Sequence, residues 1–214
     1  MPARDPLTEH LIRSTAPRAA VSALPQRAGG TRSRAGNAMA RTRAGLLDGA
    51  LRAVTKHGTR RATMHDIAAL AGVAKATLYN HFRTKDDVWS ALVESEVRAI
   101  AQECAELPLV EALAQAAVRL SEHPALRHVA DTEPAAFAGL LARRSQPAGW
   151  RAAEEAVRDR LAAACLGGDD LVLRWLSSYL AAPSRRGPIH TAAEALVRGL
   201  PPAPASEPGR EAAG

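Results

Sequence analysis

Side chains that can donate hydrogen bonds gather between Gly72 and Asp87, in the stretch GVAKATLYNHFRTKDD. The chain has 28 Lys and Arg residues, yet only three are lysines, and two of these, Lys75 and Lys85, fall here. Aromatic residues make up 3% of the chain, but a tyrosine and a phenylalanine also lie in this stretch. Ammonium, hydroxyl, amide and imidazole groups without a carboxylate before Asp86 suit contact with a polyanion rather than bond-making chemistry.

Two short helices are predicted on either side of Gly72. Thr63 followed three residues later by Asp66 is a capping box variant, so a helix is expected to begin directly after the threonine. The glycine is expected to end this helix, and a second helix should run from about Ala74 to His81. Apolar residues at helical spacing predict a core shared by both helices: Ile67, Leu70, Val73 and Leu78.

The second helix would then present a row of outward positions: Lys75, Ala76, Thr77, Tyr79, Asn80 and His81. This surface can donate hydrogen bonds to base edges, and the small Ala76 permits close approach. A helix of this kind fits the DNA major groove. Lys75 could read a base or contact a phosphate. Tyr79 could be core or phosphate-facing, and we favour its hydroxyl reaching phosphate.

Helix starts on both sides of this segment suit contact with the DNA backbone. Thr84 and Asp87 repeat the capping pattern of Thr63, and the free N–H groups of helix N-termini attract phosphate oxygens. Lys85 places a cation at the second of these starts. A solvated surface lysine is the alternative reading of Lys85.

The charge is unevenly distributed. Residues 1–43 hold eight arginines against two carboxylates, and residues 44–85 hold seven Lys and Arg against two aspartates. Residues 86–214 instead hold thirteen arginines against eighteen carboxylates. A polyanion partner is therefore expected for the first part of the chain alone.

Every periodic segment of the chain reads as helix, which predicts an all-α fold. After a long helix over 86–104, prolines and glycines divide the chain into further helices, at about 108–122, 124–130, 134–145, 148–166, 169–182 and 188–199. The expected organisation has four parts: a disordered basic extension over 1–40, a helix-turn-helix domain over 41–85, a helical domain over 86–200 and a disordered tail over 201–214. Met39, just before the first helix, is a candidate translation start.

The segment TMHDIAALAGVAKATLYNHFRTKDDVWSAL, preceded by GLLDGALRAVTKHG, resembles the DNA-binding domain of the tetracycline-repressor (TetR) family of bacterial transcription regulators. The resemblance covers about fifty residues, from Arg43 to Val93. It implies that three N-terminal helices bind DNA and that a fourth links them to a variable all-α domain, which binds an effector and dimerises. On that resemblance the recognition helix carries Lys75, Thr77, Tyr79, Asn80 and His81, whereas Thr63 and Lys85 match positions that usually hold the DNA backbone.

The implied function is a ligand-responsive repressor that binds a palindromic operator as a homodimer, with two recognition helices about 34 Å apart. The alternatives are an activator of the same fold and an architectural DNA-binding protein without a ligand response. The expected partners are double-stranded DNA, a small-molecule effector and a second copy of the chain, in the cytoplasm. Dimerisation is expected through 148–166 with 169–182, whose apolar stripes could instead be intramolecular core.

The sequence says less about the residues of an effector pocket than about the DNA-binding residues. Large side chains in an alanine-rich domain give four candidates: Phe137, Trp150, Trp175 and Tyr179, each of which could equally be plain core. His123, His128 and Gln115 are polar groups that could fix a ligand.

Several other classes of site find no support in the sequence. It has no HExxH, P-loop or GxSxG motif, so we expect no enzyme and no cofactor. His123 and His128 are five residues apart with a proline between them, so no metal site is expected. Cys104 and Cys165 do not make a disulfide framework. No apolar run reaches the length of a membrane helix, so no membrane partner is expected.

Overall fold

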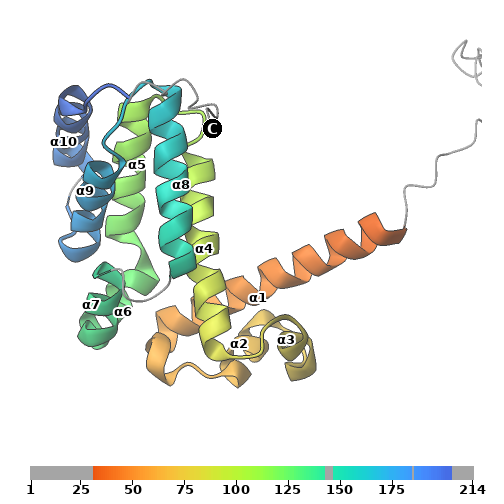
Figure 1. The fold of residues 1–214 in the computed structure, drawn as a ribbon. Coiled ribbons are helices and arrows are strands. Elements are labelled where there is room, and N and C mark those ends of the chain that lie inside the picture. The colour runs from red at the N-terminus through yellow and green to blue at the C-terminus, as the bar shows by residue number, and fades with distance from the viewer. Residues whose placement is uncertain (1–30, 143–146, 185, 204–214) are drawn as a thin grey trace, which may run out of the picture. The chain divides into compact units, whose positions relative to one another are not determined.

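The computed structural model describes residues 31–142, 147–184 and 186–203. These residues form ten helices, and the expected all-α fold is confirmed (Figure 1). The helices are α1 (Thr31–Arg61), α2 (Met64–Ala71), α3 (Lys75–His81), α4 (Lys85–Glu103), α5 (Leu109–Glu122), α6 (Pro124–Thr132), α7 (Pro134–Leu141), α8 (Pro147–Ala163), α9 (Asp169–Ala181) and α10 (Arg186–Gly199). Within the described ranges the β-structure consists of one isolated bridge, between Leu166 and Pro202.

The first helix begins earlier than the sequence predicted. Residues 1–30 of the expected disordered extension lie outside the described residues, as do residues 204–214 of the expected tail, but residues 31–40 are helical. Alanine and arginine are good helix formers, and no proline interrupts 31–61, so the helical pattern extends towards the N-terminus. The chain divides into two units, Met1–Asn37 and Ala38–Gly214, and the second is described below.

The helices α1 to α3 and the start of α4 share one core, to which α6, α7 and α9 also contribute residues. Its fully buried side chains include Leu46 of α1, Ile67 of α2, Leu78 of α3 and Val88 of α4. The predicted core residues Leu70 and Val73 pack against it while partly buried. This core fixes the position of α3 relative to its neighbours, because each of the four elements contributes a side chain.

Gly58 interrupts α1 near its C-terminal end. Its backbone has φ 77° and ψ 172°, and helical residues resume up to Arg61. Gly58 therefore forms a kink between two helical pieces. Only glycine adopts this backbone region without strain.

The helices from α4 onward form a second group (Figure 1). Here α4 lies along α8, whereas α5 packs against both α9 and α10. The fully or nearly fully buried residues of a second cluster come from four helices: Ala117 of α5, Leu161 of α8, Val172 of α9, and Ile189 and Ala193 of α10. Helix α4 belongs to both groups, since Val88 lies in the first core and Ile100 packs with α5 further on.

Much of the apolar stripe expected at a dimer interface packs inside the chain. Leu161 and Tyr179 are buried in the second cluster, with Val157 and Trp175 packed against them. Leu171 is the exception, with 49% of its surface exposed. No helix in the described ranges is long and apolar enough to cross a membrane.

Candidate functional site

The turn between α2 and α3 has a regular helix-ending geometry. Gly72 has φ 69° and ψ 29°, the left-handed conformation. Its N–H donates to the carbonyl of Ala69 at 3.1 Å, and the N–H of Val73 donates to the carbonyl of Ala68 at 3.0 Å. These two bonds form a Schellman motif, which satisfies two terminal carbonyls of α2. The glycine at this position is therefore what turns the chain into α3.

Capping boxes begin both helices that flank α3. The Thr63 hydroxyl accepts a bond from the Asp66 N–H at 3.2 Å, while Asp66 Oδ2 accepts from the Thr63 N–H at 2.9 Å. Thr84 and Asp87 repeat the arrangement at 3.1 and 2.9 Å. The hydrogen bond from the Thr63 side chain is the largest cause that lowers the pKa of Asp66, and the Thr84 backbone bond lowers the pKa of Asp87. Both predicted caps are thus formed by ionised aspartates.

The six candidates on the second helix all lie on α3, which holds Leu78 as its fully buried anchor. Lys75, Ala76, Tyr79 and Asn80 are exposed, and the other two candidates, Thr77 and His81, are half-buried. Tyr79 has 49% of its surface exposed, so it is not a core residue. The seven-residue helix α3 therefore presents an ammonium, a phenol and an amide to solvent on one face.

The two candidates outside α3 are already engaged within the chain. The Thr63 hydroxyl also donates to Asp66 Oδ2 at 2.7 Å, so the capping box uses it fully. Lys85 is half-buried, and its Nζ donates to the carbonyl of Arg60 at 3.0 Å. This lysine joins the start of α4 to the end of α1, a role that the sequence did not reveal.

Two arginines of α1 that the sequence analysis did not single out support the same domain. Arg43 places its guanidinium 4.5 Å from the centre of the Phe82 ring, directly after α3. Arg52 donates to the carbonyl of Leu70 at 2.6 Å and pairs with Asp48 at 2.8 Å. Only the ion pair could have been expected from local spacing, because Asp48 and Arg52 are four residues apart on a helix.

A cavity of about 630 Å³ lies among the helices that follow α3. Its wall is mostly aliphatic, with two tryptophans, Trp89 of α4 and Trp150 of α8. Helix α4 supplies one wall, and α1 reaches the cavity through Leu51, Val54 and Thr59. Small-molecule sites have this size and this kind of lining.

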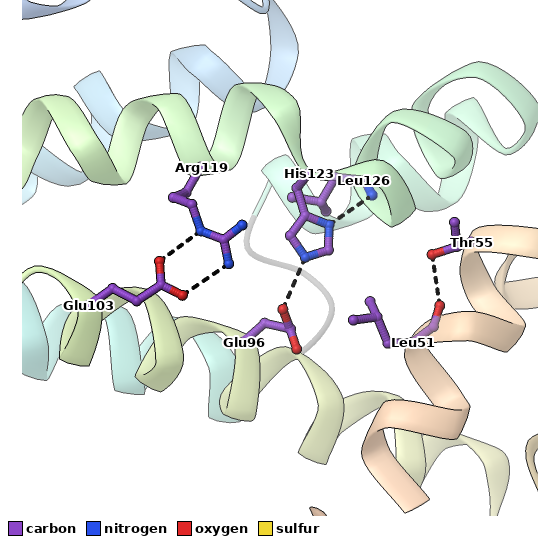
Figure 2. A network of polar contacts seen from close by, with 7 residues as sticks. All are labelled: Leu51, Thr55, Glu96, Glu103, Arg119, His123 and Leu126. Carbon is purple, nitrogen blue, oxygen red and sulfur yellow. Dashed lines mark hydrogen bonds and ion pairs between the residues drawn. The ribbon is translucent and has the colours of Figure 1, made fainter. Parts of the chain in front are cut away.

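The polar residues of this wall include a pair of a buried histidine and a half-buried glutamate. His123 is 6% exposed, and its Nε2 lies 3.1 Å from Glu96 Oε2 (Figure 2). Its Nδ1 accepts a bond from the N–H of Leu126 at 3.4 Å, where it caps α6. Because Nδ1 acts as acceptor, we assign the proton to Nε2, which donates to Glu96.

A family model described as bacterial regulatory proteins, tetR family, matches residues 46–92, from α1 through α3 into α4. The match covers the helix-turn-helix segment, which is therefore similar to the DNA-binding domain of that family. The chain is 44% identical over 54 residues to the HTH-type transcriptional regulator TtgR of Pseudomonas putida, over 25% of this chain and 26% of TtgR. The probable HTH-type transcriptional regulator ArpR, also of Pseudomonas putida, matches with the same values. The chain thus spans about a quarter of the length of these curated relatives.

Two solved structures share the fold of this chain. Salmonella enterica GusR has a TM-score of 0.50 at 15% identity, over 74% of this chain and 94% of that chain. The TetR family repressor AlkX from a Dietzia species has a TM-score of 0.52 at 19% identity, over 73% and 93%. At these identities the likeness concerns the fold alone.

One of the four candidate effector residues lines the cavity. Trp150 is in the wall, and its Nε1 donates to the carbonyl of Leu140 at 3.1 Å. Phe137 instead belongs to the first core. Trp175 and Tyr179 stack edge to face at 4.9 Å in the second cluster, where burial raises the pKa of Tyr179. Trp89 and Glu96, which the sequence did not single out, take their place in the wall.

The remaining candidate chemistry gives no further centre in the part that the structure describes. Cys104 is buried and Cys165 is exposed, and both are free thiols. Among the described residues no three His, Cys, Asp or Glu side chains gather so that they could hold a metal ion.

Proposed function

We propose that this chain is a DNA-binding transcription regulator in which α3 enters the major groove. The observation that carries the proposal is the donor-rich outer face of α3, held by a Schellman turn and a buried Leu78 within the domain that matches the family model. Lys75 and Asn80 are exposed there and can donate to base edges. Tyr79 is exposed on the same helix, and its hydroxyl can donate to a phosphate.

The backbone contacts of this proposal come from helix N-termini more than from side chains. The Thr63 hydroxyl is held in its capping box, and the Lys85 ammonium has the Arg60 carbonyl as partner. Thr63 therefore acts by exposing the first N–H groups of α2, and Lys85 adds its charge from beside α4. Both remain members of the proposed interface, in these roles.

We further propose that the regulator is a homodimeric repressor that releases a palindromic operator when an effector fills the cavity. The support is the continuity of the wall: α4 begins at the N-terminal domain and also supplies Trp89, Val93 and Glu96 to the cavity. α1 contributes Leu51 and Val54. A ligand there touches elements of both helix groups, so it can bind one arrangement of α4 more tightly than another and shift the equilibrium.

The proposal is tested by mapping the DNA fragments that the full chain retains from genomic DNA and measuring its affinity for them. A sequence-specific site with two-fold symmetry, bound by a dimer in analytical ultracentrifugation, is expected. Binding to all fragments alike, with the same salt dependence, would instead indicate an architectural protein.

Two substitutions distinguish the proposed roles of Asn80 and Lys75 on α3. Asn80→Ala is expected to reduce preference for the operator over a mutated site by about 1–3 kcal/mol, because a direct base contact is lost. Lys75→Ala is expected to do the same if it reads a base, or to lower the salt slope by about one if it contacts a phosphate. Fluorescence anisotropy against salt measures both quantities.

Arg198→Ala is the matched control, because this arginine is exposed on α10 and outside the N-terminal domain. This substitution removes one cation, and it should leave both the preference for the operator and the salt slope unchanged. The assignment of α3 fails if Asn80→Ala behaves like this control.

A further inference from the structure

The cavity wall holds a carboxylate, that of Glu96, which pairs with no lysine or arginine among the described residues. The charged residues in this wall are Asp86, Glu96 and Arg160. Glu96 has 27% of its side chain exposed, and one of its oxygens, Oε2, is the one that His123 contacts. His123 accepts from the Leu126 N–H through Nδ1 and contacts Glu96 through Nε2, so the partner of this carboxylate is an imidazole and not a lysine or arginine.

Two arginines on helices that pack against α4 have other partners. Arg119 of α5 holds both oxygens of Glu103, at 2.8 and 3.2 Å, as a separate pair (Figure 2). Arg160, at another part of the wall, donates to the carbonyls of Ala105 and Leu107. Neither guanidinium pairs with Glu96, so its charge faces an aliphatic wall without a counter-charge from either.

A carboxylate in such a wall selects the charge of what fills the cavity. A ligand removes water from Glu96, and an unpaired charge in an apolar site is costly. A cation that takes the place of the water restores an ion pair, whereas an anion adds repulsion at low effective dielectric. Trp89 and Trp150 in the same wall are the residue type that best accommodates a cation on its ring face.

We propose that the effector site takes a lipophilic cation, an amine or quaternary ammonium with an apolar body, whose charged group lies against Glu96. The apolar body fills the aliphatic part of the cavity, formed by residues such as Val97, Leu113 and Leu173. This inference rests on the proposed effector site and adds the chemical class of its ligand.

The probes are three molecules with the same chain: decyltrimethylammonium, decanol and decanoate, each below its micelle concentration. Binding to the full chain is followed by calorimetry and by tryptophan fluorescence, since two of the three tryptophans line the cavity. The cation is expected to bind on the order of tenfold more tightly than the alcohol, and decanoate most weakly, as one charged contact contributes about that factor. Tighter binding of decanoate, equal binding of all three, or no binding of the cation overturns the proposal.

Glu96→Gln tests the residue. The glutamine can still accept the His123 bond through its amide oxygen, so the fold is kept and the charge is lost. The cation should lose on the order of tenfold in affinity while decanol is unchanged. Glu94→Gln is the matched control: it lies on the same helix, pairs with Arg98 at 2.8 Å and is not in the wall. If both variants bind the cation alike, Glu96 is not the determinant.

DNA release is measured separately, by adding decyltrimethylammonium to the complex with the operator. Binding that depends on Glu96 supports the ligand class even if DNA stays bound, and the regulatory proposal then fails alone. Decanoate preference with intact operator binding overturns the ligand class alone.

Discussion

Replacing Glu133 by glutamine is expected to lower the free energy of unfolding by about 2–4 kcal/mol. Glu133 is 7% exposed and lies between α6 and α7. Its carboxylate accepts a bond from the Arg60 N–H at 2.9 Å and another from the Thr59 hydroxyl. An amide has one oxygen instead of two and no charge, so it cannot accept from both donors, and the bond that it keeps is no longer charge-assisted.

This contact also explains the kink at Gly58. The kink turns the N–H of Arg60 and the hydroxyl of Thr59 towards the carboxylate, and a Cβ on Gly58 would collide with Glu133 Oε1. The link joins the end of α1 to the junction of α6 and α7. Urea denaturation followed by circular dichroism measures its contribution. Glu122→Gln, exposed at the end of α5, is the control and should stay within about 0.5 kcal/mol of the wild type.

The contact of Glu133 with Thr59 and Arg60 should also make the stability of the chain depend on pH in the acid range. Burial alone would raise the pKa of Glu133, but the bonds from Thr59 and Arg60 outweigh it and lower the pKa below its ordinary 4.5. The unfolded chain therefore binds the proton first, so the stabilisation is complete above pH 4.5 and is lost as the pH falls through the folded value. Stability of Glu133→Gln should fall less steeply below pH 4.5 than that of the wild type. Parallel curves would mean that the carboxylate is not held by these donors.

Features set by neighbouring residues could be read from the sequence. Thr63 with Asp66 and Thr84 with Asp87 are three residues apart, and both capping boxes are present. Gly72 ends α2 in the left-handed conformation. Prolines at the first turn mark the starts of α6 and α7. Each of these signals involves residues within one turn, where spacing alone determines which atoms meet.

Contacts between segments that are distant along the chain could not be predicted from the sequence. Glu133 meets Thr59 across 74 positions, and Glu96 meets His123 across 27. The rotation of a helix about its axis decides which side chains face a cavity. The size of a side chain does not reveal which way it points. Helix α9 turns Leu173, Leu176, Ser177 and Leu180 to the cavity, whereas Trp175 and Tyr179 stack in the second cluster. Three of the four large side chains expected in an effector pocket therefore lie outside its wall.

The two glycines of α1 one turn apart should respond to alanine with opposite signs. A Cβ on Gly49 would lie 2.7 Å from both the N and Cβ of Ala71 and 2.9 Å from its Cα. The obstacle is backbone at the end of α2, which cannot move without displacing the turn at Gly72. Gly49→Ala is therefore expected to cost about 1–3 kcal/mol of stability, even after the gain in helix propensity.

Gly45 is the matched control, because a Cβ there meets nothing within 4 Å. Gly45→Ala should raise the free energy of unfolding by up to about 1 kcal/mol, the difference in helix propensity between the two residues. Denaturant unfolding of both variants measures the two signs, and stabilisation by both would show that α1 and α2 do not approach so closely. Because α2 carries the turn that positions α3, Gly49→Ala should also weaken operator binding, whereas Gly45→Ala keeps the α1–α2 contact and should leave the reading helix in place.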